Sequence, residues 1–256
     1  MSKQITWKII RGNINDHLVW MESSNGTKAL FKQPRDQGSF KLVEIANELI
    51  VYQLALRLGI PVSETYIEII DGKIGIMSII RSELNWSYIT SQNLQNKVLN
   101  IDLFKQLFAF DVFVANIDRS TGKNEHVIVI QTANGYVFYA IDHGHTLNGC
   151  TQGEKKWQLE NVADQNKFPL NNLNHLSESM IRNLNDLEPM IEKIEILHDG
   201  TIDNIVDSIC LLVSCGRSEE EKQALANNCN ITKVILKLRR DSLRLWLRNW
   251  CADKGK

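Results

Sequence analysis

The sequence of 256 residues contains no long hydrophobic run and almost no net charge. None of its apolar stretches approaches the length of about 20 residues that a helix needs to cross a bilayer. The first ten residues lack the apolar core of a signal peptide. Lys and Arg together number 29 and Asp and Glu 30, so charge does not attract the chain to nucleic acid or to an anionic membrane. We therefore expect a cytoplasmic protein with no membrane partner and no direct nucleic-acid partner.

Signatures of zinc sites and of disulfide frameworks are missing as well. The 5 cysteines are odd in number and show no C-x-x-C spacing, and the 6 histidines form no H-E-x-x-H motif. We expect the cysteines to be reduced thiols. They are Cys150, Cys210, Cys215, Cys229 and Cys251.

Short apolar segments separated by turn residues fill the first third of the chain. The sequences Ser-Asn-Gly at 24–26 and Asp-Gly at 71–72 are typical of hairpin turns, because Asn, Asp and Gly accept positive φ. Helical spacing of apolar residues runs from about 41 to 58, and Gly59 ends it. One helix is therefore predicted among five strands, at residues 5–10, 17–21, 28–32, 65–70 and 73–80.

The remainder of the chain is predicted to be mainly helical. An apolar helix at 102–115 precedes a loop at 116–124, and two strands follow at 127–131 and 136–141. Further helices are predicted at 177–187, 201–212, 218–227 and 231–250. The fold class is therefore α+β, with a small antiparallel β N-lobe that carries one helix and a larger, mainly helical C-lobe. We expect a single domain over 1–256, with the N-lobe at 1–81 and the C-lobe at 82–256.

Three polar residues follow the helix at 102–115 in an order that suggests phosphoryl transfer. Asp118 and Asn124 lie in the loop after this helix, and Asp142 ends the second of the two strands. One carboxylate can orient an attacking hydroxyl, while an amide and a second carboxylate can hold magnesium. The template for such enzymes places a catalytic Asp, a metal-binding Asn and a metal-binding Asp in this chain order.

A lysine and a glutamate in the first third complete this set. Lys32 ends the third strand and can reach ATP phosphates as a point charge. Glu44 and Glu48 lie one turn apart on the following helix, and we favour Glu48 as the partner that orients Lys32. Arg119 is a further catalytic candidate, with either a phosphate or a nearby carboxylate as its partner.

Cofactor contacts are also predicted at the first turn and at the end of the fifth strand. Gly12 permits close approach of backbone to a phosphate, and Asn13 and Asn15 share its loop. The loop has a single glycine, so an ordinary hairpin turn explains it equally well. Ile80, at the end of the fifth strand, is the remaining cofactor-binding candidate.

Four segments resemble the HipA-like kinases, a serine/threonine kinase family that includes a bacterial persistence toxin. They are A-L-F-K ending at Lys32, N-E-L-I-V-Y-Q-L-A-L-R-L-G-I-P-V from Asn47, F-D-V-F-V-A-N-I-D-R from Phe110 and A-I-D-H-G-H-T-L from Ala140. The motifs extend over about residues 5 to 150 and are most similar to the small single-domain branch of the family.

This resemblance implies a protein-kinase-like two-lobed fold and an ATP- and Mg-dependent kinase that phosphorylates protein Ser/Thr. It implies that Asp118 is the catalytic base, that Asn124 and Asp142 bind magnesium, and that Lys32 binds ATP phosphates. A protein substrate and a regulatory, antitoxin-type partner are the expected partners.

The position of the metal-binding Asn departs from the family pattern. The family places it five residues after the catalytic Asp, where this chain has Lys123, and Asn124 comes one residue later. Either Gly122 absorbs a one-residue insertion or the metal site is damaged. A pseudokinase that binds nucleotide without transferring phosphate is therefore an alternative, and a lipid or small-molecule kinase of the same fold is another. A lipid kinase would be expected to carry a basic substrate loop after Asp142. This chain has only the Lys155–Lys156 pair there, which argues weakly against a lipid substrate.

Overall fold

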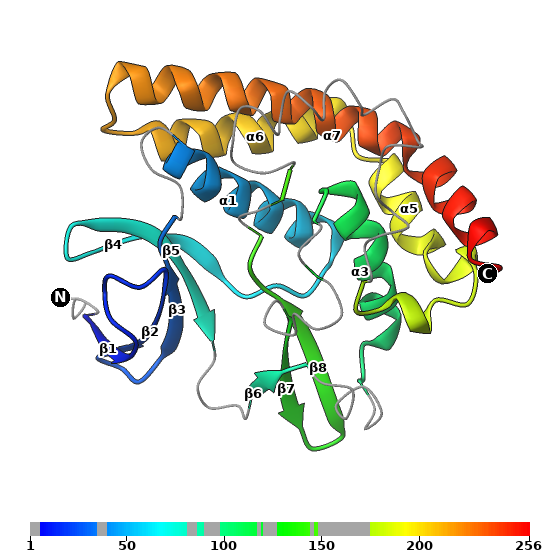
Figure 1. Cartoon of the computed structure of the whole chain (residues 1–256), viewed down its shortest axis with the longest axis horizontal. Helices are drawn as coiled ribbons and strands as arrows, with labels where there is room; N and C mark the ends of the chain where they lie inside the picture. The colour runs from blue at the N-terminus through cyan, green and yellow to red at the C-terminus, as the bar shows by residue number, and fades with distance from the viewer. Residues whose placement is uncertain are drawn as a thin grey trace.

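A computed structural model of the chain describes residues 6–34, 40–80, 86–89, 98–116, 119, 127–143, 146–147 and 175–256. A five-stranded sheet forms one side of the molecule, and long helices cover the other (Figure 1). A second, three-stranded sheet lies between the first sheet and the helices α3 (Ile101–Phe113) and α5 (Glu188–Glu195) in this view. The predicted small β-rich lobe and larger helical lobe are therefore both present.

The N-terminal sheet is antiparallel, with strand order β1-β2-β3-β5-β4. The β4–β5 turn follows its sequence signal, since Asp71 and Gly72 both have positive φ, at 50° and 76°. One face of the sheet buries a small core that includes Val19, Phe31 and Met77. Its strands are β1 (Trp7–Arg11), β2 (Leu18–Ser23), β3 (Lys28–Lys32), β4 (Thr65–Ile70) and β5 (Lys73–Ile80).

The helix α1 (Phe40–Leu58) lies between this sheet and the helices α6 (Asp199–Ser214) and α7 (Glu219–Asp253) (Figure 1). It is buried almost all round, and its side chains belong to the same hydrophobic core as those of α3, α5, α6 and α7. Gly59 ends the helix with φ of 78°, as its sequence position predicts. The helix is therefore held between the two lobes rather than by the N-terminal sheet alone.

The second sheet has strand order β6-β7-β8 and is also antiparallel. Ala140, at the end of β8, forms a parallel bridge with Val62 and donates its N–H to the carbonyl of Pro61. This contact joins the segment after α1 to the strand that leads into Asp142. The strands are β6 (Trp86–Tyr88), β7 (Val127–Thr132) and β8 (Gly135–Ala140), of which β6 was not predicted.

The helical part corrects two predictions. Residues 218–250 were predicted as two helices but form one, α7, which starts at a capping box of Ser218 and Glu221. Residues 177–187 were predicted as one helix but form two short 3₁₀ turns, η3 (Glu178–Met180) and η4 (Leu184–Asp186). In the described part of the chain, no helix combines the length and hydropathy needed to span a membrane.

Candidate active site

A lysine and three carboxylates meet where β3, α1 and the end of β8 come together. The Nζ atom of Lys32 lies 3.4 Å from Oε2 of Glu48 and 3.8 Å from Oε1 of Glu44, and it also contacts Oδ1 of Asp142. The contact between Lys32 and Glu48 that the sequence led us to expect is therefore present, and Glu44 lies farther away. The side chain of Asp142 is 30% exposed, against 9% for Lys32 and 4% for Glu48. Asp142 is thus the member of the cluster that a ligand can reach.

Local backbone features bring these side chains together. Lys32 pairs with Ile76 of β5, and a Cβ on the neighbouring Gly75 would lie 2.6 Å from the carbonyl oxygen of Lys32. Glycine at 75 therefore permits close approach of the two strands at the lysine. Asp142 has φ of 61°, an uncommon conformation for a non-glycine residue that often marks functional sites.

Glu48 also fixes the segment that follows Asp142. Its Oε1 accepts the backbone N–H of His143 at 2.7 Å, while its Oε2 faces Lys32. The side-chain amide of Asn47, the preceding residue of α1, donates to the carbonyl of Thr146 at 3.1 Å. The helix α1 thereby holds Lys32 and the backbone around Asp142 in one rigid arrangement.

The cluster carries one positive and three negative charges. Burial alone would lower the pKa of Lys32, but the charges of Glu48, Asp142 and Glu44 raise this pKa above its ordinary value, so the amine stays protonated. Burial raises the pKa of Glu48, and the charge of Lys32 opposes this effect. Among the described residues, no group of three acidic, His or Cys side chains could hold a metal ion by itself. Asp142, the most exposed carboxylate of the cluster, fits one ligand of a magnesium ion that also binds a nucleotide phosphate, and the ammonium of Lys32 suits a phosphate.

An apolar cluster adjoins the charged one. Leu30 lies two residues before Lys32, on the same face of β3, and Ile141 directly precedes Asp142. Together with Ile80 and Ile128 they form a separate buried group, against which Trp20 packs. Apolar side chains from both sheets next to a charged pair are a suitable environment for the base of a nucleotide. Ile80 belongs to this cluster, and its cofactor-binding role stays a prediction.

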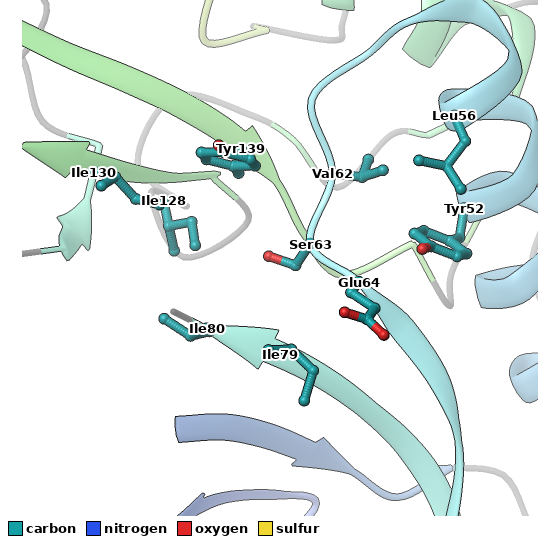
Figure 2. Close-up of a pocket in the computed structure, with 10 residues that line it drawn as sticks. All are labelled: Tyr52, Leu56, Val62, Ser63, Glu64, Ile79, Ile80, Ile128, Ile130 and Tyr139. Carbon is teal, nitrogen blue, oxygen red and sulfur yellow. The ribbon is translucent and has the colours of Figure 1, made fainter. Parts of the chain in front are cut away.

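A cavity of about 400 Å³ lies beside this apolar cluster. Figure 2 shows Ser63 and Glu64 between the end of β5 on one side and β7 and β8 on the other. The cavity shares Ile80 and Ile128 with the apolar cluster, but Lys32, Glu48 and Asp142 do not line it. The cavity therefore adjoins the apolar cluster but does not include the charged one. Its described lining is Tyr52, Leu56, Val62, Ser63, Glu64, Ile79, Ile80, Ile128, Ile130 and Tyr139.

The loop between β1 and β2 lies at the Lys32 end of the sheet, because Leu18 pairs with Lys32. Two of its backbone N–H groups form hydrogen bonds to side chains of the same loop. The N–H of Asn13 donates to Oδ2 of Asp16 at 2.7 Å, and the N–H of Asn15 donates to Oδ1 of Asn13 at 2.9 Å. Gly12 has φ of 92°, which fits the turn. Of the two roles that the sequence left open, this geometry favours the ordinary hairpin turn.

Arg119 pairs with a carboxylate. Its Nε donates to Oδ2 of Asp111 at 2.6 Å, and its side chain is fully buried. Its other nitrogen atoms lie 3.4 Å from the carbonyl of Ile141 and 3.3 Å from Nδ1 of His143. Arg119 therefore contacts the backbone carbonyl before Asp142 and the imidazole ring of the residue after it. This geometry does not support its place among the catalytic residues.

Asp118 and Asn124 lie outside the described residues, so their roles stay predictions. Sequence reasoning missed two other residues, Asp111 and His175, which contact each other at 2.8 Å between Oδ2 and Nε2. The signal for Asp111 is a charged residue inside the apolar run F-D-V-F-V of α3. His175 has no comparable signal.

Comparisons with known proteins bear on the fold. The chain is similar to the crystal structure of the Helicobacter pylori proinflammatory kinase CtkA, with a TM-score of 0.57 and 15% identity over 91% of this chain and 93% of that one. It is also similar to HipA from a Shewanella oneidensis MR-1 toxin–antitoxin complex with HipB and operator DNA. This second match has a TM-score of 0.44 and 11% identity, over 96% of this chain and 66% of that one, and is too weak to argue from. Comparisons of the sequence with protein-family models and with curated proteins gave no match.

The likeness to CtkA confirms the fold predicted from the sequence. At the level of the fold, this likeness agrees with the resemblance to HipA-like kinases. The chain has an α+β, kinase-like fold, and the charged cluster lies at the junction of its two parts.

Proposed function

We propose that the protein is a kinase that uses ATP and magnesium to phosphorylate a hydroxyl group, that of a protein Ser or Thr. The observation that carries this proposal is the contact of Lys32 with both Glu48 and Asp142, beside an apolar cluster that suits a base.

Each residue then has a defined task. Leu30, Ile80, Ile128 and Ile141 contact the base, and Lys32 contacts the phosphates in the direction that Glu48 sets. Asp142 and Asn124 hold magnesium, which neutralises charge on the phosphates when bound. Asp118 accepts the proton of the acceptor hydroxyl while the hydroxyl oxygen bonds to the γ-phosphorus. The bond from that phosphorus to the β–γ bridging oxygen breaks, and ADP leaves.

The test is incubation of the pure protein with ATP labelled at the γ-phosphate, with and without magnesium, and with a general Ser/Thr acceptor protein. We expect magnesium-dependent transfer of label to Ser or Thr of the acceptor or of the protein itself. Transfer only to a lipid or a small molecule would change the acceptor class. Absence of both transfer and ATP hydrolysis would contradict the proposed activity.

The pair of Lys32 and Glu48 should behave as one functional unit. We expect Lys32→Met and Glu48→Gln each to lower the transfer rate by about 100-fold, because either change removes the same oriented ammonium. The double variant should lose little more than either single variant. The rates of all four proteins measure this coupling.

The exposed pair of Lys8 and Glu22, 2.7 Å apart across β1 and β2, is a matched control. Lys8→Met and Glu22→Gln should leave the rate unchanged, because Glu22 pairs with Lys28, at the end of β3 away from Lys32. Losses that multiply in the Lys32–Glu48 double variant would refute the functional pairing.

The one-residue shift of the metal ligand has its own prediction. Asn124→Ala should lower the rate by about 100-fold and raise the magnesium concentration needed for half-maximal activity. Lys123→Ala should change both values little. Magnesium titrations of the two variants measure both values. A large loss in Lys123→Ala with little change in Asn124→Ala would instead assign the magnesium ligand to residue 123.

A pseudokinase is the second candidate function, favoured by Lys123 at the position of the metal-binding Asn. It predicts binding of nucleotide without transfer or hydrolysis. The cytoplasmic location and the antitoxin-type partner stay predictions from the sequence.

A further inference from the structure

Asp111 is a buried carboxylate within the apolar helix α3, with 1% of its surface exposed. Three side chains donate to it. Arg119 Nε and His175 Nε2 lie 2.6 Å and 2.8 Å from its Oδ2, and Asn116 Nδ2 lies 3.1 Å from its Oδ1. The backbone N–H of Asn116 also donates to the carbonyl of Asp111 at 2.8 Å. One side chain therefore gathers donors from three separate points of the chain.

The three donors, Asn116, Arg119 and His175, lie next to segments that the proposed chemistry uses. Asn116 and Arg119 flank residues 117 and 118 in the sequence, and residue 118 is the proposed catalytic base. Both flanks of that base are therefore bonded to Asp111. His175 lies at the far end of the long connection after Asp142, and the N–H of Leu176, which follows it, donates to the carbonyl of Arg119 at 3.3 Å. The end of this connection is thus attached to the same point.

The charges at this junction are matched. Burial alone would raise the pKa of Asp111, but the charge of Arg119 and the hydrogen bond from His175 hold this pKa below its ordinary value. The carboxylate is therefore ionised beside one guanidinium. The N–H of Ser177 donates to Nδ1 of His175 at 3.1 Å, which leaves the ring proton on Nε2, where it points to Asp111.

Burying the ion pair of Asp111 and Arg119 costs desolvation free energy, so it is a poor source of stability for the contact between the helix and the loop. Well-packed apolar side chains of similar volume often give equal or greater stability, because they avoid the cost of desolvating two charges. Hydrogen bonds to a carboxylate, in contrast, fix direction as well as distance. The arrangement around Asp111 is therefore better suited to orienting the loop than to stabilising the fold.

We propose that Asp111 is the positioning residue for the catalytic loop, and that it fixes both flanks of Asp118 and, through His175, the end of the connection that follows Asp142. This inference rests on the proposed kinase function. Asp111 touches neither nucleotide nor acceptor in this scheme and acts through the placement of Asp118. Lys32 contacts Glu48 and Asp142 directly, whereas Asp111 reaches the neighbours of Asp142 only through Arg119, at 3.4 Å from the carbonyl of Ile141 and 3.3 Å from the ring of His143. Loss of the Asp111 carboxylate should therefore affect nucleotide binding much less than kcat.

The experiment compares kcat, the KM for ATP and the thermal shift with Mg·ATP in the whole protein and its variants. Asp111→Asn should lower kcat by about 100-fold, as expected for a misplaced catalytic group. The KM for ATP and the Mg·ATP-induced shift should stay within about threefold of the wild-type values. A kcat close to wild type in folded Asp111→Asn would overturn the proposal, as would a loss confined to KM.

A second pair of variants answers the question even if Asp111→Asn does not fold. His175→Ala removes one donor to Asp111 and should lower kcat by about tenfold. His175→Gln should recover most of that loss, because its amide N–H can replace the Nε2 donor. Wild-type kcat in His175→Ala, or no recovery in His175→Gln, would overturn the proposal.

Asp186→Asn is the matched control. It removes a carboxylate that also accepts from a lysine and from a backbone N–H, at 2.9 Å from Lys105 and 2.8 Å from Arg182, but lies in η4. It should leave kcat unchanged. If wild type and this control both fail to transfer phosphate, the proposed function itself fails. If both transfer it and the Asp111 and His175 variants do so equally well, only the positioning role is refuted.

Discussion

Asp142→Asn will abolish measurable phosphoryl transfer while the protein stays folded. The change removes the charge of the one exposed carboxylate in the cluster, and loss of a charged magnesium ligand should lower the rate by about 1,000-fold or more. Lys32 keeps Glu48 and Glu44 as counter-charges, so no buried ammonium is left unpaired. Asn also tolerates the φ of 61° at this position better than Ala does. Label transfer and a thermal melt of the same sample measure both parts of the prediction.

Asp71→Asn is the matched control for this variant. Asp71 is also an Asp with positive φ, at 50°, but it lies in the β4–β5 turn. It should keep the wild-type rate and melting temperature. If Asp142→Asn kept more than about a tenth of the wild-type rate, a charged metal ligand at 142 would be excluded.

Asp118→Ala will lower kcat by about 100-fold to 10,000-fold without weakening nucleotide binding. A general base contributes an effect of this size, because it takes a proton in the transition state and does not contact the nucleotide beforehand. The KM for ATP and the stabilisation by Mg·ATP should therefore stay close to those of wild type. Steady-state kinetics with varied ATP, together with melts, separate this variant from Asp142→Asn, which should lose the stabilisation as well.

A wild-type kcat in Asp118→Ala would assign the base to another residue. A loss of nucleotide binding would instead mean that Asp118 is a metal ligand, and that the chain order of the three polar residues has been assigned wrongly.

Local signals in the sequence were enough to predict the strands of the N-terminal sheet and the pair of Lys32 and Glu48, but not the contact of Lys32 with Asp142. Hairpin turns such as Asp71–Gly72 fix the strand register, and Gly59 fixes the end of α1. Lys32 and Glu48 then meet because their strand and helix are consecutive in the chain. Asp142 was found by its place after an apolar strand and by its order relative to Asp118.

Features that depend on distant contacts were not predictable in this way. His175 meets Asp111 across 64 residues, and no local pattern specifies such a pairing. The break predicted within α7 is absent, because its Asn-rich stretch contains no Gly or Pro and Asn228 donates to the carbonyl of Ala224 one turn earlier. Leu56 fits the apolar spacing of α1 but is 50% exposed, because the last turns of α1 are uncovered on the side that carries Gln53, Leu56 and Arg57.

The most direct test of the account is the thermal stability of the wild-type protein with Mg·ATP, with ATP alone and with neither. Binding at a hundredfold excess over the dissociation constant should stabilise the folded state by about 2.7 kcal/mol, a rise in Tm of about 5 °C. We expect that this rise needs magnesium and is lost in Asp142→Asn but kept in Asp71→Asn. No rise in the wild-type protein, or the same rise in Asp142→Asn, would contradict the assignment of Lys32 and Asp142 to a site for magnesium and nucleotide.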